Sequence, residues 1–376
     1  MQLLFSDKNI NVAQLYPFTL TRKVEDIRMG IFTIREKWLQ ITGAVAGKKA
    51  TAAGPGTNNY IIAANLLPNE EMAALIGKLK PGQQILDPEG NMLVTRASSS
   101  LKKKTVAPAV ANKVLRIEFP WHIFQYNAEA LAFDFELAKK GRKRGTIAKT
   151  VCISGKGKVF IEKGADVRHA IINADDGPVF IEQGALVMEG SLLRGPLYIG
   201  AGAVVKMGTK LYGATTIGPG CTVGGEIKNS VLFAYSNKAH DGYMGDSVIG
   251  EWCNWGGGTT NSNLKNTAGN ITVHLQGNKY NAGKKCGVMM GDYSRTAINT
   301  SINTGTVIGV SANVFGAGLT PKQIPSFSWG FDDTTPYRLE KALADINNWK
   351  GFKHASLTET EIETLTNIYK SKTRSK

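Results

Sequence analysis

The sequence predicts an α/β domain, then a triangular coil of short parallel strands, then a short helical tail. The coil is indicated by an aliphatic residue at every sixth position from Ile181 to Val223. A helix needs apolar residues every three or four positions and a half-buried strand every two, so neither explains a period of six. A chance alternation in an ordinary β-sandwich is the alternative, and the long run of matches disfavours it. The residue type also recurs every eighteen positions, in the sets Ile181, Ile199 and Ile217; Val187, Val205 and Val223; Leu193 and Leu211. We therefore expect three sides per rung, with rungs that stack to bury these residues.

The segment 1–149 lacks the six-residue period and predicts the α/β domain. Strands are expected at Gln2–Phe5, Tyr60–Asn65 and Val114–Phe119, and helices at Glu70–Leu79 and Asn127–Lys140. Strands that alternate with helices are typical of α/β folds. Asn127 is a candidate N-cap for the last of these helices, because its side chain can accept a hydrogen bond from a free N–H of the first turn.

The coil is expected to occupy residues 150–320 and to be interrupted twice. Its phase slips at Glu226–Asp246, and a polar excursion follows at Asn261–Cys286. Interruptions of a rigid scaffold project loops, and loops are where binding and catalytic residues concentrate. Residues 321–376 form the tail, with helices expected at Tyr337–Trp349 and Thr358–Lys370.

The amino-acid composition limits the classes of binding partner that we expect. The net charge is +15, but the basic residues are scattered and are not interleaved with aromatic residues, so we expect no nucleic acid partner. A basic surface also suits anionic, phosphorylated small molecules. The four cysteines match no zinc spacing, and no apolar run approaches the ~20 residues of a membrane span. No signal peptide is recognised, so we expect a cytoplasmic protein with reduced thiols and no membrane contact.

The phase slip contains the side chains best suited to chemistry. His240 could act as a general base near neutral pH. Lys228 and Lys238 could hold a phosphate as point charges, and Asn254 and Asn263 could donate hydrogen bonds to an oxyanion. Judged by spacing alone, a single surface histidine is more often solvated than catalytic.

The hexapeptides IGAGAV and IGPGCTV, together with the string KAHDGYMGDSVIGEWCNWGGGTTNSN, resemble one family. That family comprises bifunctional glucosamine-1-phosphate N-acetyltransferases and N-acetylglucosamine-1-phosphate uridylyltransferases. The resemblance implies a left-handed parallel β-helix in which His240 deprotonates the substrate amine. Tyr243 and Asn254 would then hold the sugar, and Lys228 would contact its phosphate. A second cationic position maps loosely onto Lys206 or Lys210.

The same resemblance implies a co-substrate and an assembly. Acetyl-CoA would lie along the outside of the coil near Asn263 and the rung around Gly291–Ser294, with Ser294 in contact. The β-helix would form a homotrimer with sites between neighbouring copies. The chain departs from the family pattern at Leu264–Lys285, an excursion that could cover the coenzyme groove or reshape the acyl pocket.

The N-terminal segment DKNINVAQLYPFTLTRKVEDIRMGIFTIREKW resembles a shortened sugar nucleotidyltransferase domain found beside this β-helix in some bacterial homologues. The resemblance implies that Arg22, Arg28 and Lys37 contact phosphates and that Asn127 stands where larger enzymes bind Mg²⁺ through an amide. The Gly-rich loop that cradles a triphosphate in the larger enzymes is missing. The alternative is that these cations only form ion pairs with the neighbouring acidic residues Glu25, Asp26 and Glu36.

The expected function is amino-sugar nucleotide synthesis, which supplies UDP-N-acetylglucosamine for the cell envelope. In this interpretation the β-helix acetylates glucosamine-1-phosphate with acetyl-CoA, and the N-terminal domain transfers uridylyl from UTP with Mg²⁺. A single-activity enzyme, with either half inactive, is the first alternative. A non-enzymatic, trimeric sugar-nucleotide-binding module is the second.

Overall fold

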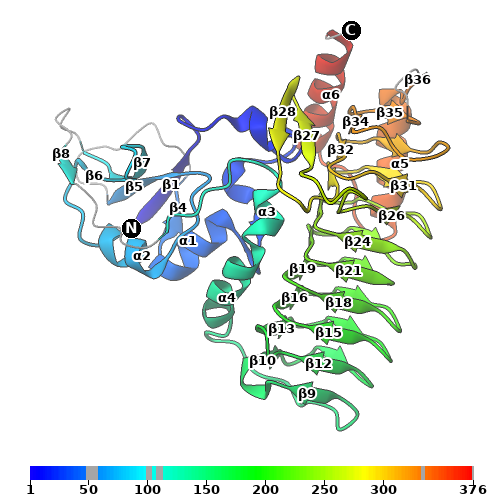
Figure 1. Cartoon of the computed structure of the whole chain (residues 1–376). Helices are drawn as coiled ribbons and strands as arrows, with labels where there is room; N and C mark the ends of the chain where they lie inside the picture. The colour runs from blue at the N-terminus through cyan, green and yellow to red at the C-terminus, as the bar shows by residue number, and fades with distance from the viewer. Residues whose placement is uncertain (48–57, 99–103, 107–112, 332–334, 375–376) are drawn as a thin grey trace.

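The computed structural model describes residues 1–47, 58–98, 104–106, 113–331 and 335–374. Figure 1 shows an N-terminal α/β domain beside a parallel β-solenoid, with two helices packed at the C-terminal end of the solenoid. This is the predicted order of parts.

The N-terminal domain contains a six-stranded mixed sheet in the order β4-β1-β5-β7-β6-β8. Its strands are β1 (Gln2–Ser6), β4 (Val45–Ala46), β5 (Asn59–Ala63), β6 (Gln83–Leu86), β7 (Met92–Arg96) and β8 (Lys104–Val106). Its helices are α1 (Ile34–Thr42), α2 (Glu70–Ile76), α3 (His122–Gln125) and α4 (Asn127–Ala138). Between β1 and α1 lie 3-10 turns at Val12–Leu15, Phe18–Leu20 and Val24–Asp26, and a short hairpin of β2 (Arg28–Met29) and β3 (Phe32–Thr33).

Two local predictions for this domain are wrong. The segment expected as a strand at Val114–Phe119 forms only an isolated bridge, between Leu66 and Arg116, because it lies against a loop rather than a strand. Asn127 is not the N-cap of α4; Tyr126 occupies that position, and the Asn127 side chain points to the solenoid instead.

The solenoid has three faces, each a ladder of very short strands. Face 1 contains β10 (Val159–Ile161), β13 (Val179–Ile181), β16 (Leu197–Ile199), β19 (Thr215–Ile217), β22 (Val231–Leu232), β25 (Val248–Ile249), β29 (Met289–Met290), β32 (Val307–Ile308) and β34 (Gln323–Ile324). Face 2 contains β11 (Asp166–Val167), β14 (Leu186–Val187), β17 (Val204–Val205), β20 (Thr222–Val223) and β23 (Asn237–Lys238), continued by β30 (Arg295–Thr296), β33 (Asn313–Val314), β35 (Ser328–Trp329) and β36 (Thr335–Pro336). Face 3 contains β9 (Cys152–Ser154), β12 (Ile171–Asn173), β15 (Leu192–Arg194), β18 (Lys210–Tyr212), β21 (Glu226–Lys228) and β24 (Tyr243–Gly245). Two further strands, β26 (Thr260–Asn261) and β31 (Ser301–Ile302), pair with each other.

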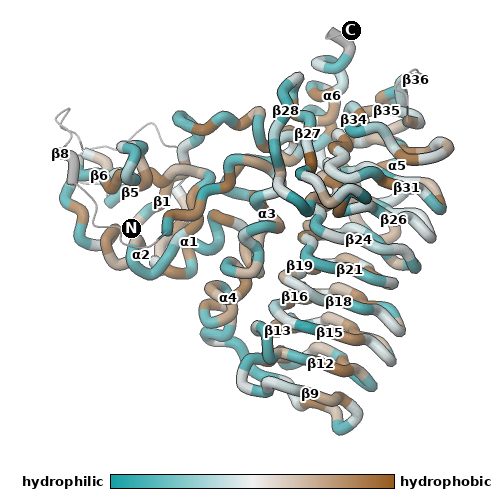
Figure 2. The backbone as a smooth tube through the Cα atoms, in the orientation of Figure 1, coloured by the Kyte–Doolittle hydropathy of each residue, from teal (hydrophilic) through white to brown (hydrophobic). Residues whose placement is uncertain are grey.

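The predicted aliphatic columns are confirmed. Ile181, Ile199 and Ile217 are in register on face 1, the corresponding valines on face 2, and Leu193 with Leu211 on face 3. All eight side chains lie in one buried cluster inside the coil. Along the rungs, hydrophobic and hydrophilic segments alternate in Figure 2, as expected where side chains point in turn to the interior and the surface.

Face 1 is buried on its outer side as well. Phe160, Phe180 and Tyr198 point outward and pack with Phe32 and Phe135 of the N-terminal domain. Further along the coil, outward residues of face 1 join the core of that domain; they are Val231, Val248, Met289 and Val307. Figure 1 shows α4 running alongside this face. The N-terminal domain therefore covers one of the three faces.

The polar excursion packs on the N-terminal domain. It forms the hairpin of β27 (Thr272–Leu275) and β28 (Asn278–Asn281), and its apolar residues belong to the N-terminal core. The Tyr280 ring lies 4.8 Å from that of Phe119, and Gln14 Nε2 donates to the Tyr280 hydroxyl at 3.3 Å. The hairpin joins the two domains on the side of face 1. That it also covers a coenzyme groove or reshapes an acyl pocket stays a prediction.

The C-terminal tail forms α5 (Leu339–Gly351) and α6 (Glu359–Arg374), close to the predicted ranges. Thr358 and Glu361 form the expected reciprocal cap: the Glu361 N–H donates to Thr358 Oγ1 at 3.2 Å, and the Thr358 N–H donates to Glu361 Oε2 at 2.7 Å. Within the described residues, no helix is long and apolar enough to cross a bilayer.

Asn127 joins three segments at the junction of the domains. Its Oδ1 accepts from the Gly30 N–H at 2.6 Å, and its Nδ2 donates to the Ala214 carbonyl at 2.7 Å and to Thr216 Oγ1 at 3.1 Å. The Thr216 hydroxyl also donates to the Gly30 carbonyl at 2.9 Å. The Asn127 side chain is fully buried, so each of these bonds replaces one to water.

Replacing Asn127 with alanine should loosen the junction, because buried partners lose their hydrogen bonds. We expect the free energy of unfolding to fall by about 1–3 kcal/mol per group left unsatisfied. Urea unfolding followed by tryptophan fluorescence measures the change. Asn348→Ala, at an exposed position on α5, is the matched control and should stay within about 0.5 kcal/mol of wild type. Equal losses in the two variants would contradict the role given to Asn127.

Candidate functional site

His240 lies on the corner of the solenoid between faces 2 and 3. The turn 239–242 joins β23 to β24 there, and the imidazole is exposed. The next rung places Gly257 beside it: a Cβ at Gly257 would lie 3.7 Å from both Cβ and Cγ of His240. On the previous rung, a Cβ at Gly224 would lie 2.3 Å from the Ala239 carbonyl oxygen. Glycines thus let neighbouring rungs close tightly around the histidine turn.

Face 3 next to this corner carries a network of polar side chains. Asn263 Nδ2 donates to the Tyr243 hydroxyl at 3.1 Å and to Asp246 Oδ2 at 2.5 Å. Asn229 Nδ2 donates to the other carboxylate oxygen of Asp246 at 2.6 Å. Burial, reinforced by the charges of Asp246 and Glu226, raises the pKa of Tyr243 to about 12. The Tyr243 hydroxyl therefore keeps its proton at neutral pH and can donate it in a hydrogen bond.

Lys228 belongs to the same surface. It is in register with Tyr212 on one side and Gly245 on the other, and its Nζ lies 5.6 Å from the centre of the Tyr212 ring. The Tyr212 hydroxyl donates to Glu226 at 2.6 Å. Because Gly245 has no side chain, the Tyr243 hydroxyl can extend over it; a Cβ there would lie 2.3 Å from that oxygen.

The structure thus brings together three of the predicted residues, Lys228, Tyr243 and Asn263, on face 3, at the end of its strands that leads into face 1. His240 lies at the other end of face 3, in the turn that precedes β24. Sequence reasoning missed the residues that hold them in place, namely Tyr212, Glu226, Asn229 and Asp246. The sequence could not single these residues out, because only the pairing of strands on neighbouring rungs brings each one next to a predicted residue.

Lys206 and Lys210 are both still candidates for the second cationic position. Lys206 lies on the same corner as His240, two rungs earlier. The Lys206 N–H bonds to the Val223 carbonyl on the next rung, and the Gly224 N–H bonds to the Lys238 carbonyl on the rung of His240. Lys210 lies on face 3, in register with Glu226. The phosphate contact expected of Lys238 is not supported, because its side chain points into the coil and is 2% exposed.

Asn254 and Ser294 are placed apart from this network. Asn254 bridges Asn237 and Arg295 on face 2, across the corner from Tyr243. Ser294 is fully buried; its hydroxyl donates to the Gly309 carbonyl at 2.6 Å and accepts from the Ala312 N–H at 2.9 Å. In this chain the Ser294 side chain has no surface for a coenzyme to touch, so its predicted contact is not supported by the geometry.

The N-terminal cations contact protein groups, Arg22 at the domain junction and Arg28 and Lys37 within their own domain. Arg22 Nη2 donates to Asp292 of the solenoid, and its guanidinium lies 4.6 Å from the centre of the Phe233 ring. Arg28 donates to the Ile31 carbonyl and lies 3.6 Å from Glu36, with 16% of its side chain exposed.

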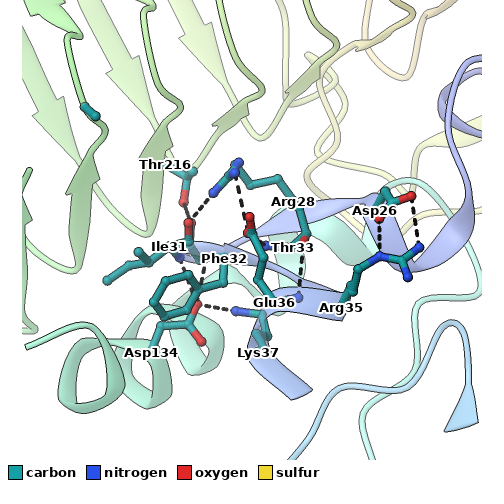
Figure 3. Close-up of polar contacts among 12 residues, drawn as sticks. Asp26, Arg28, Ile31, Phe32, Thr33, Arg35, Glu36, Lys37, Asp134 and Thr216 are labelled. Atoms are coloured by element: carbon teal, nitrogen blue, oxygen red, sulfur yellow. Dashed lines mark hydrogen bonds and ion pairs between the residues drawn. The ribbon is translucent and has the colours of Figure 1, made fainter. Parts of the chain in front are cut away.

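Lys37 is ion-paired with Asp134, and both side chains are buried (Figure 3). Burial lowers the pKa of Lys37 and raises that of Asp134, and the opposite charge of the partner opposes each shift. The Asp134 carboxylate also accepts from the Ile31 N–H at 2.8 Å.

The Asn127 side chain is poorly placed to bind a metal ion. Its amide is buried and bonded to Gly30, Ala214 and Thr216, and the described residues contain no cluster of three or more His, Cys, Asp or Glu side chains suited to a metal. The residues present do not fit a Mg²⁺ site in this arrangement. The geometry favours a role for Asn127 in joining the domains.

Comparison with known proteins supports the division into halves. Residues 2–143 match the family model described as sugar nucleotidyl transferase. The chain is 34% identical over 100 residues to a bifunctional sugar-1-phosphate nucleotidylyltransferase/acetyltransferase of Sulfurisphaera tokodaii, covering 26% of this chain and 25% of that protein. It is 34% identical over 105 residues to a bifunctional protein GlmU of Methanococcus vannielii, covering 28% of this chain and 25% of that protein.

These alignments span about a quarter of the length of the curated relatives. A hexapeptide transferase family protein from Anaplasma phagocytophilum covers 55% of this chain and 97% of its own, at 16% identity and a TM-score of 0.26, which is too low to bear on the fold. The chain is therefore similar to the GlmU-named proteins, with a sugar nucleotidyl transferase domain followed by a hexapeptide β-helix.

Proposed function

We propose that the β-helix transfers the acetyl group of acetyl-CoA to the amine of an amino-sugar phosphate, glucosamine-1-phosphate. The observation that carries this proposal is the exposed imidazole of His240 in the turn that leads into face 3, whose strands carry the polar network of Lys228, Tyr243 and Asn263. We further propose that the N-terminal domain transfers uridylyl from UTP to the acetylated product.

The acetyl transfer requires a neutral amine. The imidazole of His240 accepts the amine proton as the nitrogen attacks the thioester carbonyl carbon, and the C–S bond then breaks to release coenzyme A. A positioned general base contributes about 10²–10⁴-fold to such a step. The close packing of neighbouring rungs at Gly224 fixes the backbone of the turn that carries the imidazole, so this backbone does not have to be ordered during the reaction.

The polar network of face 3 suits the sugar phosphate. Lys228 provides a positive charge for the phosphate, while the protonated hydroxyl of Tyr243 and the amide of Asn263 bind hydroxyl groups. The carboxylates of Glu226 and Asp246 hold Tyr212 and Asn263, respectively, in fixed orientations. Substrate orientation rather than raw affinity is the benefit of such a network.

A homotrimer completes the proposed site. Asn254 lies across the corner from the network, where it could face the substrate of a neighbouring copy. The same corner exposes apolar side chains along its length, Met207, Ile298 and Leu319, as an interface requires. Acetyl-CoA would lie between copies near Asn263. Acetyl-CoA and UTP are cytoplasmic metabolites, so the cytoplasm is the compartment we propose.

A specific observation favours a second candidate, a single-activity acetyltransferase. Arg22, Lys37 and Asn127, expected to bind phosphates and Mg²⁺, are buried in contacts with protein groups: Arg22 and Asn127 bond to the solenoid, and Lys37 pairs with Asp134 of its own domain. Uridylyl transfer needs a divalent ion to neutralise the triphosphate, and the buried amide of Asn127 is already bonded to Gly30, Ala214 and Thr216. In this candidate the N-terminal domain serves mainly to cover face 1.

His240→Asn should lower kcat/KM for acetyl transfer by about 10²–10⁴-fold. The assay follows free thiol from acetyl-CoA with glucosamine-1-phosphate as acceptor. His169→Asn is a matched control, because His169 is an exposed histidine on the same corner nearer the start of the coil, and it should leave the rate unchanged. Undiminished thiol release by His240→Asn would rule out the proposed base.

The two candidates predict different results for the N-terminal domain. If that domain is active, N-acetylglucosamine-1-phosphate, UTP and Mg²⁺ should yield pyrophosphate, and Arg28→Ala should reduce the yield by at least about tenfold, the loss of one charge-assisted contact. Arg168→Ala, an exposed arginine of the solenoid, is the control. Thiol release without pyrophosphate would support the single-activity candidate instead.

A further inference from the structure

A lysine stands inside the coil where every earlier rung has an aliphatic residue. The inward column of face 2 runs through Val167, Val187, Val205 and Val223, and Val223 is in register with Lys238. The Lys238 side chain is 2% exposed. Lysine is rarely buried, because removing an ammonium group from water is costly unless it is paired.

The ammonium of Lys238 reaches the histidine turn from within. Its Nζ donates to the backbone carbonyl of His240. A Cβ at Gly225, which has a φ of +70°, would lie 2.9 Å from this Nζ. Any other residue at Gly225 would therefore be strained and would crowd the ammonium. The stem of the lysine fills the core, and its charged end lies beneath the corner.

We propose that Lys238 is a positioning residue that holds the turn 239–242, and with it the imidazole of His240, in the geometry needed for proton transfer. The proposal rests on the proposed function of His240. An exposed imidazole packed against glycine has few side-chain contacts to restrain it, so the backbone of its turn must be fixed. A charge-assisted hydrogen bond is the stronger kind, and an aliphatic residue in this column could not supply one.

The charge of Lys238 makes this role distinguishable from simple core filling. Burial lowers the pKa of Lys238 to about 8, and Asp241, on the same turn, opposes the shift. Among the described residues that surround the lysine, Val223 in register with it and Trp255 on the next rung are uncharged, and His240 contributes a backbone carbonyl. As pH rises through about 8 the ammonium becomes an amine, the bond to His240 weakens, and the catalytic rate should fall.

Lys238→Met tests the proposal, since methionine keeps an unbranched apolar stem and removes the charge. We expect kcat to fall about 10–100-fold with KM for the sugar phosphate changed by less than about twofold, because orientation rather than binding is lost. In wild type, we expect kcat/KM to decline near pH 8 as Lys238 loses its proton. This contribution to the decline should be absent from Lys238→Met. Val205→Met, two rungs earlier in the same column, is the control for altered packing and should keep the wild-type pH profile.

Two further measurements separate the possible failures. Amide hydrogen exchange in the turn 239–242 should be faster in Lys238→Met than in wild type or Val205→Met, whether or not the enzyme is active on the chosen substrates. Unchanged exchange would overturn the proposal. So would a Lys238→Met enzyme with wild-type kcat, or one with reduced kcat that keeps the full decline near pH 8. Activity retained in His240→Asn would instead refute the proposed function, while the exchange result would still decide whether Lys238 orders the turn.

Discussion

The burial of face 1 on both of its sides is the interaction on which the rest of the structure depends. Inside the coil, aliphatic residues stack in columns. Outside it, Phe160 and Phe180 stack on each other with ring centres 5.0 Å apart, and Phe180 packs edge-on against Phe135 of the N-terminal domain at 6.3 Å. Each rung is too small to be stable alone, so a continuous face buried twice provides a large share of the apolar area. The domain and the solenoid therefore form one structure along this face.

Charged residues are also buried in the part of the N-terminal domain that packs on face 1. A buried ion pair such as Lys37 with Asp134 costs desolvation of both groups, and it is tolerated when hydrogen bonds satisfy the carboxylate as well. The backbone N–H groups of Ile31 and Phe32 donate to Asp134 Oδ2 at 2.8 and 3.3 Å and supply such bonds to that oxygen, whereas Oδ1 is buried without a partner among the described residues. Removing one partner of the ion pair would leave an uncompensated charge in the interior of the N-terminal domain. The cations of the N-terminal segment are thus bound to protein groups in this arrangement, whatever ligand they contact during a reaction.

The solenoid leaves the corner between faces 2 and 3 outside this interface, and the irregular rungs occur there. Lys210 pairs with Glu226 and Glu226 with Tyr243, so the ladder of face 3 continues although the spacing along the chain has changed. Because the backbone ladder is intact, the backbone of face 3 in the slipped segment keeps the same pairing as in the regular rungs. A polar network on a rigid ladder can orient a substrate with little loss of conformational freedom on binding.

The sequence alone determined the solenoid, its interior columns and the helical tail, because a period of six reports directly which residues point inward. The resemblance pointed to Lys228, Tyr243 and Asn263, which the structure brings together, whereas their catalytic roles stay predictions. Periodicity is a local property, and so it could not show that face 1 is covered on its outside, that the polar excursion becomes a hairpin on the N-terminal domain, or that Asn127 bonds to Thr216. Nor could it show that Lys238 continues the valine column, since the slip in phase hides the register that only backbone pairing restores. Contacts between segments far apart in the chain decided these points, because they depend on how the domains pack rather than on the order of residues in either one.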